Sequence, residues 1–186
     1  VTHYRNGDPI PHVTDGGTWS GLYSGAYCEY DNDGGNVSTY GRLYNWYAVD
    51  DSRNIAPEGW HVPTDEEWKQ LEMYLGMSQS EADDTGYRGT DEGGKLKESG
   101  TTHWDHNTGA TNESGFTALP GGGRGSGGYF HYMGSYAYFW SSTERSSSSA
   151  WHRMLGSSAE LGYLNAQVHR GSFKKRHGFS VRCVRD

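Results

Sequence analysis

The most informative stretch is Pro63-Thr64-Asp65-Glu66-Glu67-Trp68, which has the features of a helix start. Thr64 and Glu67 have the spacing of a capping box, in which each side chain bonds the backbone N–H of the other residue. Leu71 and Leu75 then share a helical face with Trp68, and Gly76 is a suitable C-terminal cap. The pattern predicts a helix over 65–75. We expect Trp68 to be buried against the sheet, because it begins the only strongly amphipathic face.

Further along the chain, the sequence predicts helices early and strands late. Ser78 and Glu81 repeat the capping-box spacing, which predicts a second, shorter helix over 79–85, and Lys95–Glu98 can add a single turn. After residue 100 turn-forming residues dominate, and the expected strands are short: 136–140, 150–155, 161–169 and 179–184. In the last of these, alternation puts Phe179, Val181 and Cys183 on one face, so we expect Cys183 to be mostly buried. The pattern predicts one α+β domain spanning residues 1–186.

The composition is that of a folded protein with many loops. A mean hydropathy of −0.88 would by itself suggest disorder, but seven Trp, fourteen Tyr and five Phe provide large buried areas that a disordered chain lacks. The 28 glycines among 186 residues show no collagen-like period. No apolar run approaches the roughly 18 residues of a membrane span, and no signal peptide opens the chain, as expected of a mature or trimmed domain.

The charge balance argues against nucleic acid as a partner. Sixteen Lys and Arg against twenty-three Asp and Glu give a net charge of −7, whereas nucleic acids and anionic lipids bind clustered cations. One basic cluster lies near the C-terminus, and we interpret it as solvated strand residues that balance acidity elsewhere. Its members are Arg170, Lys174, Lys175, Arg176, Arg182 and Arg185.

The sequence predicts no metal site and no cofactor. Cys28 and Cys183 are the two cysteines, and they have no CxxC spacing, so they either pair or remain as buried free thiols. His103 and His106 lie in a stretch typical of a loop, without the helix and the glutamate that a zincin motif needs. Asp31-Asn32-Asp33 resembles a fragment of a calcium loop but lacks its glycine and terminal glutamate, which favours an Asx-rich turn.

The glycine-rich segment Gly121–Gly128 could be taken for a phosphate-binding loop. No Lys-Ser or Lys-Thr follows it and no helix is predicted to start there, so we expect a flexible surface loop instead. The late loops around it are rich in Tyr, Trp, His, Ser and Gly. Rigid aromatic anchors among small polar residues are typical of an adaptable binding surface, and carbohydrate sites also use aromatic platforms.

Five ordered motifs resemble a known family. They are YGRLYNW at 40–46, APEGWHVPTDEEW at 56–68, TNESGFTALPGG at 111–122, FWSSTE at 139–144 and GFSVRCVRD at 178–186. Together they resemble the Fibrobacter succinogenes major paralogous domain family over nearly the whole chain. More distantly they are similar to the formylglycine-generating, sulfatase-modifying fold. The resemblance implies a C-type-lectin-like fold, with two helices, a short antiparallel sheet and long irregular loops.

The resemblance also bears on function. Sulfatase-modifying enzymes work through a cysteine pair in their C-terminal half, and here that half holds only Cys183, so the resemblance implies a non-enzymatic ligand-binding domain. A further resemblance is to the variable proteins of diversity-generating retroelements, bacterial and phage receptors whose variable segment precedes the chain end, where residues 145–177 lie here. The alternative is a carbohydrate-binding adhesion module, with a sulfatase-modifying-type enzyme third. We expect an extracellular or cell-surface location and an unknown protein or carbohydrate ligand.

This interpretation names a binding surface. Alternation along the late strands should turn one set of side chains outward together, while Trp151 and Val168 point inward. Tyr129 and Tyr132, beyond the glycine-rich segment, could complete the patch as aromatic anchors. The predicted ligand-binding residues are Tyr129, Tyr132, Arg145, His152, Met154, Leu161, Tyr163, His169 and Phe173.

Overall fold

A computed structural model describes residues 1–157 and 165–186, and it shows few helices and mostly strands in sheets. The helices are α1 (Gly16–Ser20), α2 (Val37–Tyr40), α3 (Trp46–Val49), α4 (Asp65–Tyr74), α5 (Gln79–Asp83) and α6 (Glu92–Leu96). Within the described residues only α4 exceeds five residues, so the expectation of two helices was too simple.

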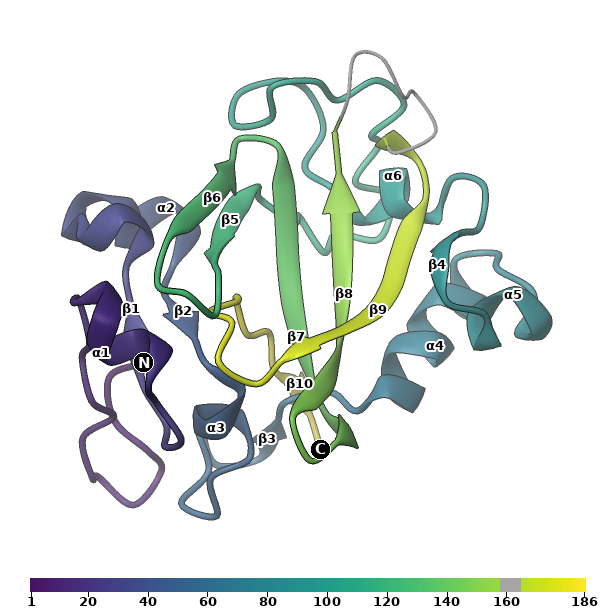
Figure 1. Ribbon diagram of the computed structural model, residues 1–186. Helices are drawn as coiled ribbons and strands as arrows, with labels where there is room; N and C mark the ends of the chain where they lie inside the picture. The colour runs from purple at the N-terminus through teal and green to yellow at the C-terminus, as the bar shows by residue number, and fades with distance from the viewer. Residues whose placement is uncertain (158–164) are drawn as a thin grey trace.

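The strands form one large sheet and two small ones (Figure 1). Early strands are β1 (Tyr27–Cys28), β2 (Leu43–Tyr44), β3 (Trp60–His61) and β4 (Gly86–Arg88). Later strands are β5 (Gly121–Arg124), β6 (Phe130–Met133), β7 (Tyr136–Ser146), β8 (Ser149–Gly156), β9 (Val168–Lys174) and β10 (Val184–Arg185). The large sheet has the order β4-β9-β8-β7-β5-β6, and β1-β2 and β3-β10 pair separately. Because β5 and β7 pair in parallel, the large sheet is mixed, not antiparallel throughout as expected.

The two capping boxes are confirmed. Thr64 and Glu67 bond each other's backbone at the start of α4, and Ser78 and Glu81 do the same at the start of α5. Trp68 is buried between the rings of Phe116 and Phe139, as expected. The single turn expected at 95–98 is instead the end of α6, which begins at Glu92. The segment 98–117 forms neither helix nor strand, in agreement with the expected long loops.

The late strands were located correctly only in part. The predicted strands 136–140 and 150–155 are confirmed and extend to form the β7–β8 hairpin. The prediction of a strand over 161–169 was misplaced, since β9 begins at Val168, and residues 158–164 lie outside the described part. In 179–184, Phe179 and Ser180 make only isolated bridges before β10. Val181 and Cys183 do pack on the core cluster that holds Phe179, but Cys183 is half-buried, not mostly buried.

The prediction of a flexible surface loop was wrong for the first half of the glycine-rich segment. Gly121–Arg124 is the buried strand β5, not a flexible surface loop. Gly122 has φ +59°, and a Cβ there would lie 2.6 Å from the carbonyl oxygen of His131, so only glycine allows β6 to approach so closely. Arg124 is buried between the rings of Trp19 and Phe130, and its guanidinium donates to three backbone carbonyls. Glycine here serves close strand packing.

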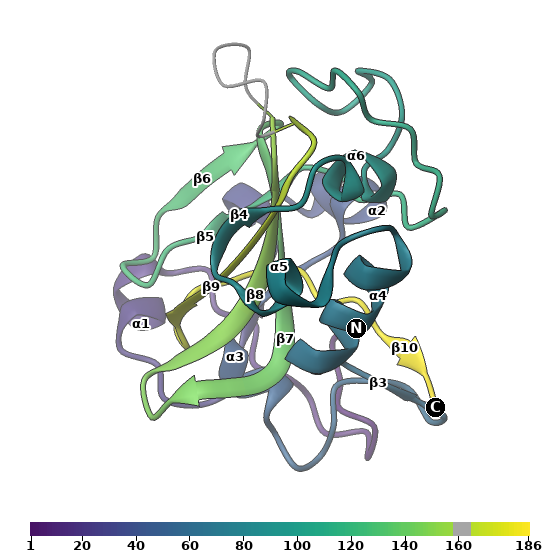
Figure 2. The same cartoon turned by 90° about the vertical axis from the view of Figure 1, so that its right-hand side faces the viewer.

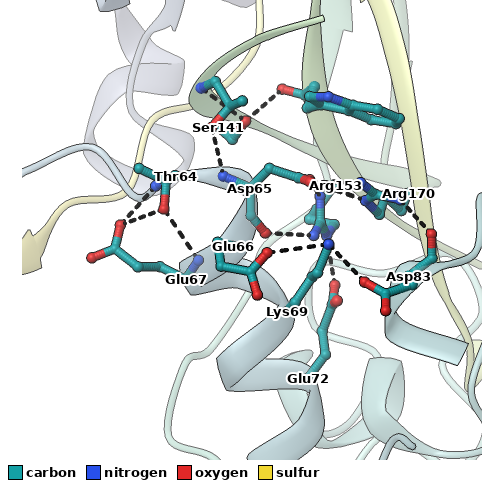
Figure 3. A network of polar contacts seen from close by, with 12 residues as sticks. Thr64, Asp65, Glu66, Glu67, Lys69, Glu72, Asp83, Ser141, Arg153 and Arg170 are labelled. Atoms are coloured by element: carbon teal, nitrogen blue, oxygen red, sulfur yellow. Dashed lines mark hydrogen bonds and ion pairs between the residues drawn. The ribbon is translucent and has the colours of Figure 1, made fainter. Parts of the chain in front are cut away.

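A buried ionic network holds α4 on one face of the large sheet (Figure 3). Glu72 of α4, with no exposed surface, accepts from Arg153 of β8 at 2.6 Å and from Arg88 of β4 at 3.0 Å. Asp65, at the start of α4, accepts from Arg153 and from Arg170 of β9, each at 2.6 Å. Burial raises the pKa of Asp65, but the hydrogen bonds and charges of these two arginines outweigh it and leave that pKa lowered. Three strands are thus tied to one helix.

Helices α4 and α6 cover one face of the central strands, and on the other face α3 packs beside β7, where Trp46 joins Tyr138 and Trp140 in one core cluster. Viewed together, Figures 1 and 2 show α4 and α6 behind β7, β8 and β9. On the helix side, Val168 and Leu155 join the core cluster that contains Trp68. The opposite side carries the candidate site.

Candidate ligand-binding surface

The register of the large sheet aligns aromatic and histidine side chains in one row on the side opposite α4 and α6. Tyr138 of β7 lies opposite Met154 of β8, which lies opposite His169 of β9, which lies opposite Tyr87 of β4. Residues directly opposite each other in neighbouring strands point to the same face. His152 and Phe173 belong to this face too, because they lie two and four positions from Met154 and His169 along their strands.

The rings on this side contact one another from β4 to β6. Centroid distances are 4.8 Å for Tyr87–His169, 5.7 Å for His169–His152, 4.7 Å for His152–Phe173, 6.4 Å for Phe173–Tyr138, 5.9 Å for Tyr138–Tyr136 and 5.1 Å for Tyr136–Tyr132. His131 contacts Tyr132 and Tyr138, and His177 contacts Phe173. We call this surface the aromatic face. It consists of Tyr87, His131, Tyr132, Tyr136, Tyr138, His152, Met154, His169, Phe173 and His177.

Exposure divides the aromatic face into a floor and a rim. Tyr138, His152 and Met154 form the floor and are buried, with Phe179 stacked on Tyr138 at 4.7 Å. Tyr132 and Phe173 are 56% and 37% exposed, and the remaining rings are half-buried. Tyr132 has φ 66°, a break in the strand alternation at which both His131 and Tyr132 contact rings of β7. Rigid rings are therefore presented to solvent on a fixed support.

Close packing of the two central histidines depends on Gly171. A Cβ at this position would lie 2.7 Å from Cε1 of His169 and 3.1 Å from Cε1 of His152. The first distance is a clash, so a larger residue at 171 would separate the imidazoles. Gly171 therefore fixes the geometry of the floor although it contributes no side chain.

The aromatic face is uncharged at neutral pH. Burial is the main cause that lowers the pKa of each of its four histidines, and for His177 the value falls to about 4. For His152, the positive charges of His169 (when protonated) and Arg153 lower the pKa further. No carboxylate is present among the ten residues of this surface. The chemistry it offers is ring stacking, tyrosine hydroxyls and imidazole nitrogens, which suits binding better than acid–base catalysis.

Comparison with known proteins places the chain in a family. The family model of the Fibrobacter succinogenes major domain matches residues 1–185. The chain belongs to this family. Neither the curated proteins nor the solved structures include a match. The family name points to bacteria, and the function of this Fibrobacter succinogenes major domain is argued from its site.

The sequence prediction of the site placed the side chains of β8 on the correct face but not at the correct depth. His152 and Met154 lie on the expected face, but they are only 1% and 8% exposed, so they do not project into solvent. They were expected to be exposed because strand alternation predicts which face a side chain points to. It does not predict whether other residues cover that side chain. Tyr132 and Phe173 are exposed in part and His169 is half-buried, so these three side chains reach the surface as expected. Leu161 and Tyr163 lie outside the described residues.

Two predicted site residues lie elsewhere. The Arg145 guanidinium stacks on Trp151 at 5.2 Å, and Trp151 points to the helix side together with Arg170. Trp151 is only half-buried, whereas Val168 is fully buried as expected. Tyr129 is exposed, but none of the described ring contacts joins it to the aromatic face. The structure therefore does not bring Arg145 and Tyr129 into the surface.

The sequence analysis missed Tyr87, His131, Tyr136 and His177 as surface residues. Tyr136 could have been found, since the alternation Tyr136-Ala137-Tyr138 places it beside Tyr138. Tyr87 lies in a three-residue strand far away in the sequence, and only the β4–β9 pairing brings it to His169. No local pattern signals such a neighbour.

The cysteines and the metal-ligand residue types of the described chain do not assemble into a site. Cys28 and Cys183 are unpaired, and burial raises the pKa of both thiols, to about 11 for Cys28. Within residues 1–157 and 165–186, no group of three or more His, Cys, Asp or Glu is arranged to hold a metal ion. Over the same residues no helix has the length and apolarity to cross a membrane. The interpretation of the basic cluster near the C-terminus as solvated was wrong for Arg170 and Lys175, which are buried and pair with Asp65 and Glu144.

Proposed function

We propose that this chain is a non-enzymatic ligand-binding domain whose binding surface is the aromatic face. The observation that carries the proposal is the continuous set of ring contacts from Tyr87 to Tyr132, partly exposed on the side of the sheet opposite α4 and α6. Tyrosine and other rigid aromatic residues bind with a small loss of conformational entropy, and they dominate the energetics of recognition surfaces. The strands below them are fixed by the buried ionic network.

A protein ligand fits this surface better than a carbohydrate. Sugar hydroxyls need carboxylates or amides beside an aromatic platform, and the ten residues of the aromatic face include neither. A neutral aromatic surface instead accommodates apolar and aromatic side chains of a partner protein. Carbohydrate adhesion stays the alternative, and the experiment below separates the two.

The thiols support the non-enzymatic part of the proposal. Thiol chemistry of the sulfatase-modifying type needs a thiolate, and the raised pKa values of Cys28 and Cys183 keep both thiols protonated at neutral pH. Cys28 is in addition completely buried. We also propose a C-type-lectin-like fold and a location outside the cell or on its surface. The two capped helices and the β3–β10 pairing, which ties the chain end to its middle, support that fold.

We further propose that a retroelement diversifies the rim of this surface. The segment 145–177 supplies β8 and β9 and therefore Phe173 and His169. Sequencing of this segment in a population of the source bacterium should find substitutions at 169 and 173, and none at Arg153, Arg170 or Val168, whose burial constrains them. A reverse transcriptase gene beside a near-copy of the segment should accompany them. Substitutions spread evenly over buried and exposed positions would contradict diversification.

Binding screens on a peptide library and on a glycan array test the function. Three proteins are compared: the wild type, the rim variant Tyr132→Ser/His169→Ser/Phe173→Ser, and the control Tyr23→Ser/Tyr74→Ser/Tyr129→Ser. The control removes exposed tyrosines from other parts of the surface. We expect peptide ligands that bind the wild type and the control equally and the rim variant at least tenfold more weakly, with Tm values of wild type and rim variant within a few degrees. Glycan binding would favour the alternative, and ligands retained by the rim variant but lost by the control would refute the surface.

A further inference from the structure

A cavity lies on the helix side of the sheet, between α4 and the segment that leads into β10. Figure 2 shows this C-terminal segment running beside α4. The cavity has a volume of about 350 Å³ and an apolar lining that includes Trp68, Leu71, Phe116 and Val184. This volume is within the range of small-molecule sites. Since Trp68 packs on Phe139, which points away from the aromatic face, the two sites are on opposite sides of the sheet.

One cation stands at the wall of this cavity. The guanidinium of exposed Arg182 lies over the Phe116 ring at 5.0 Å, and its Nη2 donates to the carbonyl oxygen of Thr117 at a long 3.3 Å. Among the described residues no carboxylate pairs with it. The Glu67 carboxylate also lines the cavity, but it already accepts from Thr64 and His61. Burial keeps the neighbouring Cys183 thiol neutral by raising its pKa. Arg182 is therefore the charged group of this lining that has no partner of opposite charge among the described residues.

A buried donor without an acceptor belongs to the same lining. Trp68 is almost fully buried, and in the described structure its Nε1–H has no hydrogen-bond partner. A buried N–H without a partner is costly, and such groups are rare in folded proteins. An apolar cavity that is lined by the rings of Trp68 and Phe116, with the Arg182 guanidinium at its edge, has the features of a site for a ligand with one ring and one anionic oxygen group.

We propose that this cavity binds a small aromatic carboxylate. The ring occupies the space between Trp68, Leu71 and Phe116, and the carboxylate pairs with Arg182. Arginine suits this role because its planar guanidinium can bond both oxygens of a carboxylate. The site is independent of the ligand surface proposed above.

Phenylacetate is the probe, with phenylacetamide as its uncharged counterpart. ¹H–¹⁵N spectra follow the indole Nε1–H signals, and that of Trp68 is assigned through its contacts with the rings of Phe116 and Phe139. For a ligand of this size we expect a Kd of roughly 1 mM, with a shift of the Trp68 signal. Phenylacetamide should bind at least tenfold more weakly. Arg182→Gln should abolish the difference between the two probes, and Arg185→Gln, a nearby exposed arginine outside the lining, should preserve it.

Three results would overturn the proposal. They are no shift of the Trp68 signal at 20 mM phenylacetate, shifts only at other tryptophans, or equal affinity of phenylacetate for Arg182→Gln and the wild type. Arg182 is exposed and makes one weak hydrogen bond, so its substitution leaves the fold intact. None of these results affects the aromatic face.

Discussion

Glu72→Gln should destabilise the protein by about 3–5 kcal/mol. The substitution keeps the shape of the side chain but removes the charge that faces Arg88 and Arg153, both of which are buried. Arg88 would then have no carboxylate partner among the described residues, and an uncompensated buried cation is far more costly than a lost surface pair. Urea unfolding at pH 7, followed by circular dichroism, measures the change in the free energy of unfolding.

Glu66→Gln is the matched control for this experiment. Glu66 lies on the same helix and pairs with Lys69 at 3.2 Å, but its side chain is well exposed. Its substitution should change the free energy of unfolding by no more than about 0.5 kcal/mol. A loss of less than about 1 kcal/mol for Glu72→Gln would show that the network does not hold α4 on the sheet.

Trp68→Ala should cost about 3–5 kcal/mol of folding free energy. The indole fills the space between α4 and the sheet, where it contacts Phe116 and Phe139, and the small side chain would leave a cavity. Thermal unfolding followed by calorimetry should show a Tm lowered by roughly 6–20 °C, since about 1 kcal/mol corresponds to roughly 2–4 °C in a chain of this size. Tyr74→Ala, at an exposed position of the same helix, should melt within a few degrees of the wild type. A Trp68→Ala protein that also melts so close to the wild type would place the core elsewhere.

The parts of the fold that follow from local rules were predictable. The capping boxes at Thr64 and Ser78 fixed the starts of α4 and α5, because the bonds they make join residues three positions apart. The glycines of β5 misled the prediction because their function is visible only when β6 is in place, as the contact of Gly122 with the His131 carbonyl shows. Local patterns do not encode which distant strand approaches.

In the candidate site, too, features set by neighbouring residues were predictable and features set by distant residues were not. Alternation placed His152, His169 and Phe173 on one face, and the structure agrees. The buried partners of Arg153 and Arg170 lie more than 80 residues away in the sequence, so nothing in the segment 145–177 distinguished these arginines from solvated ones. Tyr87 joins the surface because it pairs with His169, which lies more than 80 residues further along the sequence. A sequence gives the face of a strand, and tertiary packing decides which of its side chains a ligand can reach.

The nine histidines provide the most direct test of the aromatic face. Four of them belong to this surface, and His3, His12, His61, His103 and His106 lie elsewhere on the chain. Ring C–H signals, assigned by single His→Gln substitutions, are recorded while a peptide from the library screen is added to the wild-type protein. We predict that binding shifts the signals of His131 and His169 and leaves those of His12 and His61 unchanged. Shifts confined to the five histidines outside the aromatic face would contradict its assignment as the ligand-binding surface.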